Sequence, residues 1–431
     1  MESSSDDRED IEMSTGLRIN HNRKRVKFKK MELLAPAGSL EKLKVAIDFG
    51  ADAVYIGGKE FSLRARANNF ELCDIREGVK YAHSKNAKVY VTCNVLPHNN
   101  EVEDGKLLKY LMALEEIGVD AIIASSIYII DTCVKNCKKM QVHVSTQASV
   151  LNSIALNGYS EMGASRVVLA REASIEEIKE IRSKTNCELE VFIHGGMCAG
   201  FSGRCMLSNH MVNRDANRGG CAHSCRWNYD IFSKDKKLND DDTFFNLGSK
   251  DLCAVDYITR LIEIGVDSLK IEGRMKSEYY VATIVRAYRH LIDDYYKDHE
   301  VNIEEAKEEI NKAENRLTSH GFFAGIITTD EQLYDRDDHP SKEFVGVVLS
   351  VDKRSGNIII KQRNFFTVYD KVEFFDKDNT VEYMIEKIYD QNGAVISAAR
   401  HPEQEVMIVS KDLAKKIKPG YFMRLLLVDF N

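Results

Sequence analysis

The chain of 431 residues is 44% hydrophobic and 29% charged, which is typical of a globular protein with room for one large domain and a smaller one. It has no run of about eighteen apolar residues, so the sequence predicts no transmembrane helix and no membrane partner. The net charge of −7 argues against a protein that binds nucleic acid through an overall basic surface, although it allows a local basic patch.

The ten cysteines must be interpreted together with the expected compartment. The first residues, MESSSDDRED, are acidic and polar and lack the basic start and apolar core of a secretory signal. We therefore expect a cytoplasmic protein, whose thiols stay reduced. The cysteines are then predicted to be metal ligands, catalytic groups or core residues rather than disulfides.

Residues 1–30 have almost no apolar periodicity and are predicted to form a disordered N-terminal extension. The extension ends in a basic run, HNRKRVKFKK at 21–30. Such a run can contact RNA, but short charged runs are usually solvated tails, and the sequence leaves both interpretations open.

From Glu32 onward, short apolar runs alternate with amphipathic segments that often close on a glycine such as Gly118 or Gly265. Nearly continuous apolar runs are typical of strands buried on both faces of a parallel sheet. Eight evenly spaced runs, each followed by a helix, predict an α/β domain at 31–338 that is a (β/α)8 TIM-like barrel, with a doubly wound open sheet as the alternative. The runs are 32–38, 53–58, 88–96, 121–126, 141–147, 166–172, 188–195 and 268–275.

One interval breaks this rhythm, because the chain inserts residues 196–266 between strands seven and eight. In a parallel barrel, the loop after a strand emerges on the C-terminal face, where active sites are built. We therefore predict that the insertion lies on the catalytic face.

After a long amphipathic helix at 277–298 and a charged helical stretch at 300–317, the pattern changes. Short alternating segments run from Glu343 to Leu427. They predict a C-terminal domain, residues 339–431, that forms a small antiparallel β-barrel.

Four cysteines lie close together in the insertion, with the spacing C-x6-C-x15-C-x3-C. Their glycine-rich surroundings let the backbone wrap tightly, and thiolates suit zinc or an iron–sulfur cluster. The spacing alone does not choose the metal, and the thiols could also be plain loop cysteines. His194, His210, His223 or Cys253 could replace one ligand. The quartet is Cys198, Cys205, Cys221 and Cys225.

Polar side chains at the predicted strand ends outline a pocket. His194 and Glu272 are candidates for acid–base catalysis. Cationic and amide groups would suit an anionic substrate such as a carboxylate or phosphate. The alternatives are that His194 orients a loop and that Glu272 and Arg274 form an ion pair that closes the barrel top. The candidate substrate-binding residues are Arg64, Arg66, Asn94, Gln147, Arg274 and Lys276.

Several familiar catalytic patterns are missing from the sequence. It has no GxxxxGK[ST], no GxGxxG after a strand, no HExxH and no GxSxG. A conventional serine or zinc peptidase is therefore not supported by motif.

Three stretches of the chain, at 32–58, 190–208 and 268–289, are similar to a known family. They closely resemble the peptidase U32 family, the collagenase-like peptidases. Some members of this family are described as proteases, whereas others hydroxylate RNA or quinones and carry an oxygen-sensitive 4Fe–4S cluster. The chain is most similar to the tRNA branch, which makes 5-hydroxyuridine at the wobble position with prephenate as oxygen source. The stretches are ELLAPAGSLEKLKVAIDFGADAVYIGG, EVFIHGGMCAGFSGRCMLS and SLKIEGRMKSEYYVATIVRAYR.

The resemblance implies roles for the residues already singled out. The quartet would hold the 4Fe–4S cluster, with Cys225 or Cys253 as the fourth ligand, and zinc remains the alternative metal. Prephenate, a small dicarboxylate, would be the co-substrate, with arginines and Lys276 as its partners. Expected partners are tRNA and proteins of the same family. The rival hypotheses are a peptidase and a zinc-stabilised scaffold that binds RNA.

Overall fold

The structure is a computed structural model that describes residues 30–63, 69–102, 105–240, 242, 244–313, 316–328 and 344–426. The predicted N-terminal extension lies outside the described residues, apart from Lys30. Two candidate substrate-binding residues, Arg64 and Arg66, also lie outside them. No helix in the described ranges is long and apolar enough to cross a membrane.

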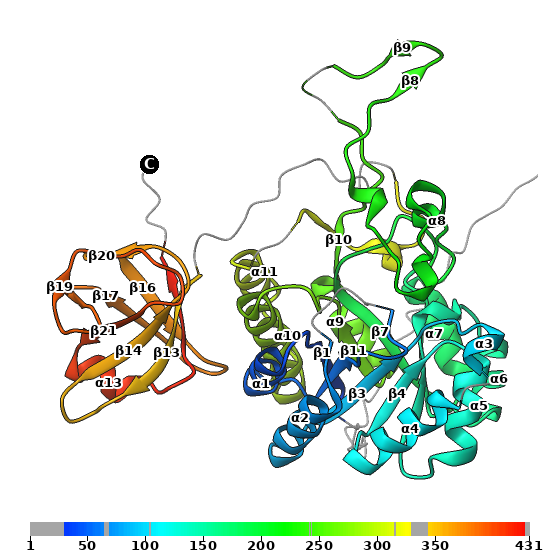
Figure 1. The fold of residues 1–431 in the computed structure, drawn as a ribbon, viewed down its shortest axis with the longest axis horizontal. Coiled ribbons are helices and arrows are strands. Elements are labelled where there is room, and N and C mark those ends of the chain that lie inside the picture. Colours follow the sequence, from blue (N-terminus) through cyan, green and yellow to red (C-terminus); the bar gives the residue numbers. More distant parts are fainter. Residues whose placement is uncertain are drawn as a thin grey trace, which may run out of the picture. The chain divides into compact units, whose positions relative to one another are not determined.

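Eight parallel strands close into a barrel (Figure 1). Each strand pairs with the next, and the last strand pairs with both the seventh and the first, which completes the ring. The predicted TIM-like barrel is therefore confirmed, and the open doubly wound alternative is wrong. The strands are β1 (Glu32–Pro36), β2 (Ala53–Gly57), β3 (Lys88–Cys93), β4 (Ala121–Ala124), β5 (Gln141–Val144), β6 (Arg166–Val168), β7 (Glu188–Gly195) and β11 (Ser268–Ile271).

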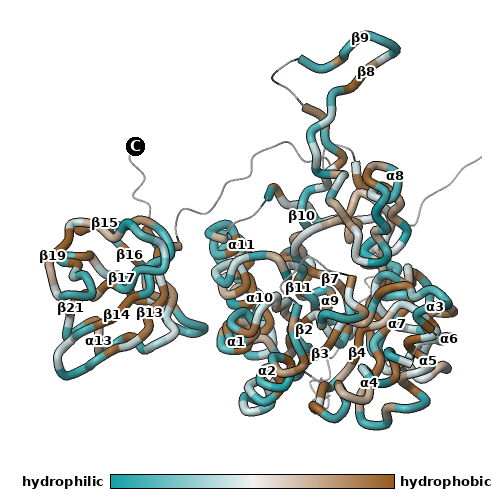
Figure 2. The backbone as a smooth tube through the Cα atoms, in the orientation of Figure 1, coloured by the Kyte–Doolittle hydropathy of each residue, from teal (hydrophilic) through white to brown (hydrophobic). Residues whose placement is uncertain are grey.

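Helices follow the strands and cover the outside of the barrel (Figure 1). In Figure 2 the barrel strands are mainly brown, whereas the helices alternate between brown and teal, as expected of helices that bury one face against a sheet. The helices are α1 (Leu40–Asp48), α2 (Leu72–Ser84), α3 (Asn99–Val102), α4 (Lys106–Ile117), α5 (Ile127–Asn136), α6 (Ser153–Glu161), α7 (Ile175–Ser183), α9 (Ile258–Ile264) and α10 (Glu278–Asp298).

Local sequence signals set where these helices begin and end. Ser39 accepts a hydrogen bond from the backbone of Lys42 at the start of α1, which satisfies a donor that the helix itself cannot pair. Gly118 and Gly265 end α4 and α9 in the left-handed conformation, with φ of 93° and 83°. Both C-caps are where the sequence predicted them.

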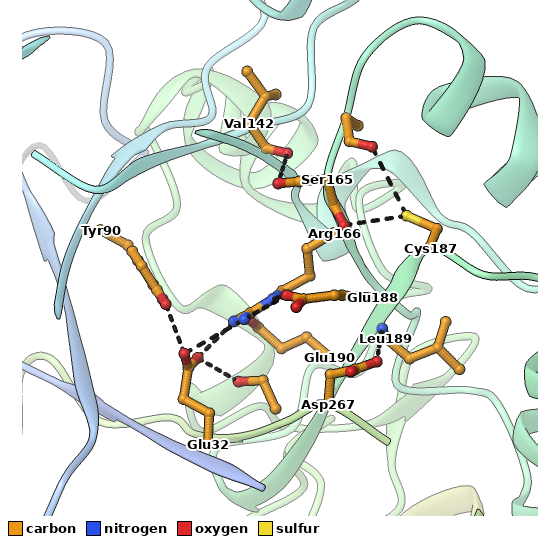
Figure 3. Close-up of polar contacts among 12 residues, drawn as sticks. Glu32, Tyr90, Val142, Ser165, Arg166, Cys187, Glu188, Leu189, Glu190 and Asp267 are labelled. Atoms are coloured by element: carbon orange, nitrogen blue, oxygen red, sulfur yellow. Dashed lines mark hydrogen bonds and ion pairs between the residues drawn. The ribbon is translucent and has the colours of Figure 1, made fainter. Parts of the chain in front are cut away.

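The N-terminal half of the barrel interior is filled by charged side chains (Figure 3). Arg166 Nη1 lies 2.5 Å from Glu32 and 3.1 Å from Glu190, and Arg166 Nη2 lies 2.8 Å from Glu188. Lys270 Nζ lies 2.6 Å from the second oxygen of Glu190. Because Glu32, Arg166 and Glu188 begin their strands, this network lies at the end of the barrel opposite the catalytic face.

The insertion after β7 adds short elements to the barrel. Strand β10 (Asp251–Cys253) pairs antiparallel with β7, and β12 (Thr318–Ser319) pairs with β10. A helix, α8 (Leu207–Val212), precedes a two-stranded ribbon that projects from the barrel (Figure 1). The ribbon ends in β8 (Phe232–Ser233) and β9 (Lys236–Lys237).

The antiparallel β structure expected in the C-terminal part is present, as one eight-stranded sheet and a separate strand pair. It follows α11 (Ile303–Asn311). Its elements are β13 (Phe344–Val351), β14 (Asn357–Gln362), β15 (Phe366–Thr367), β16 (Lys371–Phe375), β17 (Thr380–Met384), β18 (Ile388–Tyr389), β19 (Val395–Ile396), β20 (Ala398–Ala399), β21 (Glu405–Val409), α13 (Lys411–Lys416) and β22 (Phe422–Leu425).

Charged contacts join this sheet to α11. Arg424 donates to both carboxylate oxygens of Glu309, at 3.0 and 2.9 Å. Arg286 of α10 donates to the same carboxylate at 2.9 Å. The Glu309 carboxylate therefore links three elements that lie far apart in the sequence.

Candidate metal centre

The cysteine-bearing loop leaves the barrel at Gly195, the last residue of β7. Gly195 has a φ of 97°, and a Cβ at this position would lie 2.4 Å from the carbonyl oxygen of Glu272. Only glycine can take this conformation so close to a neighbouring backbone. The turn is therefore required for the chain to pass from the barrel into the insertion.

The loop is fixed across the C-terminal ends of β5 and β6. Ser202 donates its backbone N–H to Glu172 at 2.9 Å, and its carbonyl accepts from Ser149 Oγ at 2.5 Å. A Cβ on Gly203 would lie 2.0 Å from the carbonyl oxygen of Gln147, so the two backbones touch. The insertion thus lies on the face where the sequence predicted it, and Gln147 contacts the loop through its backbone.

Short elements hold the four cysteines of the insertion. Ser208 of α8 accepts a hydrogen bond from Ala222 N at 3.0 Å, and Leu247 N donates to the Cys225 carbonyl at 2.8 Å. A Cβ on Gly200 would lie 3.3 Å from Cys205 Sγ. Two thiols are exposed and two are half-buried: Cys198 and Cys221 are exposed, and Cys205 and Cys225 are half-buried.

The four thiols share one electrostatic environment. Burial raises the pKa of Cys225, and the thiols of Cys198, Cys221 and Cys205 raise it further, whereas Arg226 lowers it. Negative charges would therefore repel one another if all four groups ionised. A bound metal centre removes this repulsion, since thiolates are its ligands.

The fit of a metal centre can be tested on these observations. In the described ranges, no group of three or more His, Cys, Asp or Glu side chains converges tightly enough to hold a metal ion in its present position. The donor chemistry nevertheless fits: four soft sulfur donors, partly open to solvent, lie in one glycine-rich loop. Zinc and an iron–sulfur cluster both match this donor set.

Cys253 lies in a different environment. It sits in β10 opposite His194, and its Sγ lies 3.8 Å from the hydroxyl of Tyr288. Burial raises the pKa of the Cys253 thiol. The same tyrosine hydroxyl lies 3.2 Å from His194 Nδ1 and donates to the Ile193 carbonyl at 3.0 Å. His194 is thus buried and held in place by Tyr288, an arrangement that suits an orienting role.

Glu272 lies at the barrel mouth, just after β11. Its carboxylate is 3.4 Å from Arg171 Nη2 and 3.5 Å from the Tyr55 hydroxyl. The guanidinium carbon of Arg171 also lies 3.8 Å from the centre of the Phe192 ring. The ion pair seen for Glu272 is thus with Arg171, and not with Arg274 as the alternative interpretation of the sequence had it.

Arg274 is buried and reaches the ends of β2 and β3. Its guanidinium lies 3.1 Å from Thr92 Oγ1, 3.3 Å from Ser62 Oγ and 2.9 Å from Asn69 Oδ1. A Cβ on Gly57 would lie 2.4 Å from this guanidinium, so glycine is needed there to admit it.

Two further candidate binding residues, Asn94 and Lys276, are among the described residues. Asn94 follows β3, where its side-chain oxygen accepts from Leu63 N at 3.2 Å. Lys276 Nζ lies 5.0 Å from the centre of the Tyr280 ring. Asn94 thus lies directly after β3, and Arg274 and Lys276 lie in the segment between β11 and α10.

Sequence reasoning missed Arg171 and Lys270. Lys270 Nζ lies 4.6 Å from the centre of the Tyr55 ring and 5.3 Å from that of Phe192. The available signal was their position, because Arg171 lies in the predicted strand 166–172 and Lys270 in the predicted strand 268–275.

Two family models match the chain. The one described as Peptidase family U32 matches residues 38–332, and the one described as Peptidase family U32 C-terminal domain matches residues 340–424. The chain therefore belongs to peptidase family U32, which confirms the resemblance seen in the sequence.

The relatives carry names of two kinds. The chain is 47% identical to tRNA hydroxylation protein P1 of Bacillus subtilis, covering 94% of this chain and 96% of that protein. It is 32% identical to tRNA hydroxylation protein P of Haemophilus influenzae, covering 86% and 91%. It is also 36% identical to a collagenase of Porphyromonas gingivalis, covering 61% and 66%. Membership of the family alone does not choose between these activities.

Proposed function

We propose that this protein is an iron–sulfur-dependent enzyme that hydroxylates tRNA. The observation that carries the proposal is the loop of four thiols fixed on the catalytic face of the barrel. The tRNA hydroxylation proteins similar to most of this chain support the same activity. The specific reaction is conversion of wobble uridine to 5-hydroxyuridine, with prephenate as the oxygen source.

The ligands of the cluster are Cys198, Cys205, Cys221 and Cys225. Cys225 is favoured over Cys253 as the fourth ligand, because its thiol interacts with the other three, whereas Cys253 contacts Tyr288. A bound 4Fe–4S cluster supplies one-electron redox chemistry or a Lewis-acidic iron. The protein residues bind and orient the substrates beside it.

The dicarboxylate co-substrate binds at the cationic side of the mouth. Arg274 is already fixed by three hydrogen bonds, so little conformational freedom is lost when it binds a carboxylate. Arg171 offers a second guanidinium beside Glu272. Glu272 is the acid–base candidate at the mouth, whereas His194 acts through its contact with Tyr288 as a positioning residue.

Mass spectrometry of tRNA nucleosides tests the activity. A strain that lacks this chain is expected to lose 5-hydroxyuridine and the nucleosides made from it. The wild-type gene should restore them, and a Cys198→Ala gene should not. Unchanged nucleosides in the deletion strain, with no second enzyme of this family encoded in the genome, would overturn the proposal.

Proteolysis is the second candidate, because one relative is named a collagenase. It predicts cleavage of gelatin by the purified protein, with loss of cleavage in Glu272→Gln or Cys198→Ala. Cleavage that persists in both variants would show a contaminating protease. A zinc-stabilised scaffold is separated from both by metal analysis of protein purified without oxygen.

A further inference from the structure

We propose that unpaired RNA nucleotides dock on a surface that surrounds the cysteine quartet, an inference that rests on the proposed function. We call this surface the arginine–aromatic collar. It is formed by two aromatic residues and three arginines of the insertion: Phe201, Trp227, Arg204, Arg214 and Arg226.

Four members of the collar lie within four residues of a cysteine of the quartet in the sequence. Arg204 directly precedes Cys205, and its backbone N–H donates to the Phe201 carbonyl at 2.9 Å. Arg226 and Trp227 directly follow Cys225.

Arg214 reaches the quartet through the fold. A Cβ on Gly220 would lie 3.0 Å from the Arg214 carbonyl carbon, and Gly220 is followed by Cys221. The backbone of Arg214 therefore lies beside the residue that precedes Cys221.

The arginines of the collar are available to an external anion. Within the described part of the chain, no carboxylate forms an ion pair with Arg204, Arg214 or Arg226. By contrast, nearby Arg218 pairs with Glu101 at 2.7 Å. Arg204 does donate its Nε–H to the Ser149 hydroxyl at 3.2 Å. Guanidinium groups match the geometry of phosphate oxygens, so three arginines without a carboxylate partner among the described residues suit a nucleic-acid backbone.

The net charge of the insertion also favours a negatively charged ligand. Residues 196–250 contain eight Lys and Arg and six Asp, a net charge of +2, whereas the whole chain carries −7. The positive charge is concentrated at the cysteines, because residues 196–226 hold four of these arginines and only one carboxylate, Asp215. A local positive field on an acidic protein directs a polyanion to this place.

The aromatic members are exposed where bases could stack. Phe201 is 44% exposed and Trp227 is 39% exposed. Of the seven large exposed aromatic side chains among the described residues, five lie in the insertion: Phe201, Trp227, Phe232, Phe244 and Phe245. Every base has a flat face that can stack on such rings, but a duplex hides these faces. The collar therefore fits a single-stranded loop better than paired RNA.

The projecting ribbon extends this surface (Figure 1). Tyr229 and Phe245 face each other across it, with paired backbone hydrogen bonds of 2.8 and 2.9 Å. Ile231 and Phe232 of the ribbon are also exposed, so exposed apolar residues continue from the collar into the ribbon.

Tryptophan fluorescence can report RNA binding at the collar, because Trp227 is the only tryptophan of the chain. The full-length protein, purified without oxygen, would be titrated with a labelled RNA stem–loop whose loop is unpaired and rich in uridine. Trp227 fluorescence should be quenched with the same midpoint as the anisotropy change of the RNA. A blunt duplex of equal length should bind more weakly and quench less.

Variants test the contribution of the collar. The double variant Arg204→Ala/Arg214→Ala should bind the stem–loop at least about tenfold more weakly. The slope of log K for RNA binding against log salt concentration should become shallower by about 1.4, as expected for two lost phosphate contacts to a single strand. Trp227→Ala should weaken binding about tenfold, whereas Trp227→Phe should not, because phenylalanine still stacks. Iron content and melting temperature show whether each variant is folded and loaded.

The matched control is Phe365→Ala/Arg400→Ala, which removes an exposed arginine–aromatic pair from the C-terminal sheet. Arg400 lies 5.4 Å from the Phe365 ring centre, and Phe365 is 47% exposed. The control should bind like wild type. Equal weakening by the control, or RNA binding without any change in Trp227 fluorescence, would overturn the collar as the docking surface.

The collar and the proposed activity can fail separately. Saturable quenching in a protein whose deletion leaves tRNA nucleosides unchanged would keep the surface and reject the hydroxylase. Loss of hydroxylated nucleosides, with wild-type RNA binding by the collar variants, would keep the enzyme and reject the surface. Failure of the wild-type protein to bind the stem–loop at all would also reject the surface.

Discussion

Arg166 shows how a single residue can stabilise the barrel interior. It is 3% exposed and lies between Glu32, Glu188 and Glu190. Burial raises the pKa of Glu32, but the charge and hydrogen bonds of Arg166, together with those from Tyr90 and Ser268, lower it below its ordinary value overall. The Glu32 carboxylate therefore stays ionised in the barrel because a guanidinium is buried with it.

We expect Arg166→Met to destabilise the protein by about 3–5 kcal/mol, because it removes the cation paired with Glu32 inside the barrel. Chemical denaturation at neutral pH measures this loss. The control is Arg260→Met, which removes the ion pair with Glu176 on the surface. Equal stability of the two variants would show that the interior network is not needed.

At the level of elements, the strands and helices of the barrel could be predicted from the sequence, because their signals are local. Apolar runs marked β1 to β7 and β11, and glycines marked helix ends such as Gly118. The charged network could not, because Glu32 and Arg166 meet only when strands 134 positions apart face one barrel interior. The same holds for Arg171 and Glu272, whose pairing depends on the closed ring.

The docking of the cysteine loop depends on Gly203. We expect Gly203→Ala to displace the loop and lower iron content, because the added Cβ would meet the Gln147 carbonyl at 2.0 Å and φ is 75°. Gly105→Ala is the matched control: its φ is 65°, but no atom lies within 4 Å of the added Cβ. The control should therefore show only the backbone strain, about 1 kcal/mol. Iron content and melting temperature of both variants separate the effect of the clash with Gln147 from the effect of backbone strain. Equal iron loss in both variants would contradict the proposed dependence of the loop on Gly203.

The link between α11 and β22 is expected to respond to acid. Burial raises the pKa of Glu309, but Arg424 and Arg286 outweigh it and lower the pKa to about 2. A carboxyl group whose pKa is depressed by folding stabilises the protein above its unfolded value of 4.5, and this contribution is lost as pH falls toward about 2.

Melting temperatures measured from pH 5 down to about 2 test this contribution. Wild type should lose stability across that window. Glu309→Gln should be less stable at neutral pH and should show a smaller decrease on acidification, because it has no carboxylate to protonate. A parallel decrease in both proteins would assign the acid sensitivity to other groups.

On the scale of the whole molecule, the barrel is the scaffold, and the insertion after β7 carries four thiols on the face formed by the C-terminal strand ends. The sequence predicted this layout, since a long interval after strand seven must emerge on that face. It could not choose the fourth ligand, because Cys225 and Cys253 are both close enough along the chain. The fold places them in different surroundings: Cys225 lies in the insertion with the other three cysteines, and Cys253 lies in β10, which pairs with β7.

This separation predicts different effects of two similar substitutions. Cys225→Ala should lose iron, sulfide and the visible absorption of the proposed cluster, as should Cys198→Ala, because each removes a proposed ligand. Cys253→Ala should keep the cluster and lose at most the packing of a buried thiol against Tyr288. Iron and sulfide analysis of protein purified without oxygen makes the comparison, with exposed Cys73→Ala as the control. If instead Cys253→Ala loses the cluster and Cys225→Ala keeps it, β10 supplies the fourth ligand, and the loop must rearrange around the barrel edge when the cluster binds.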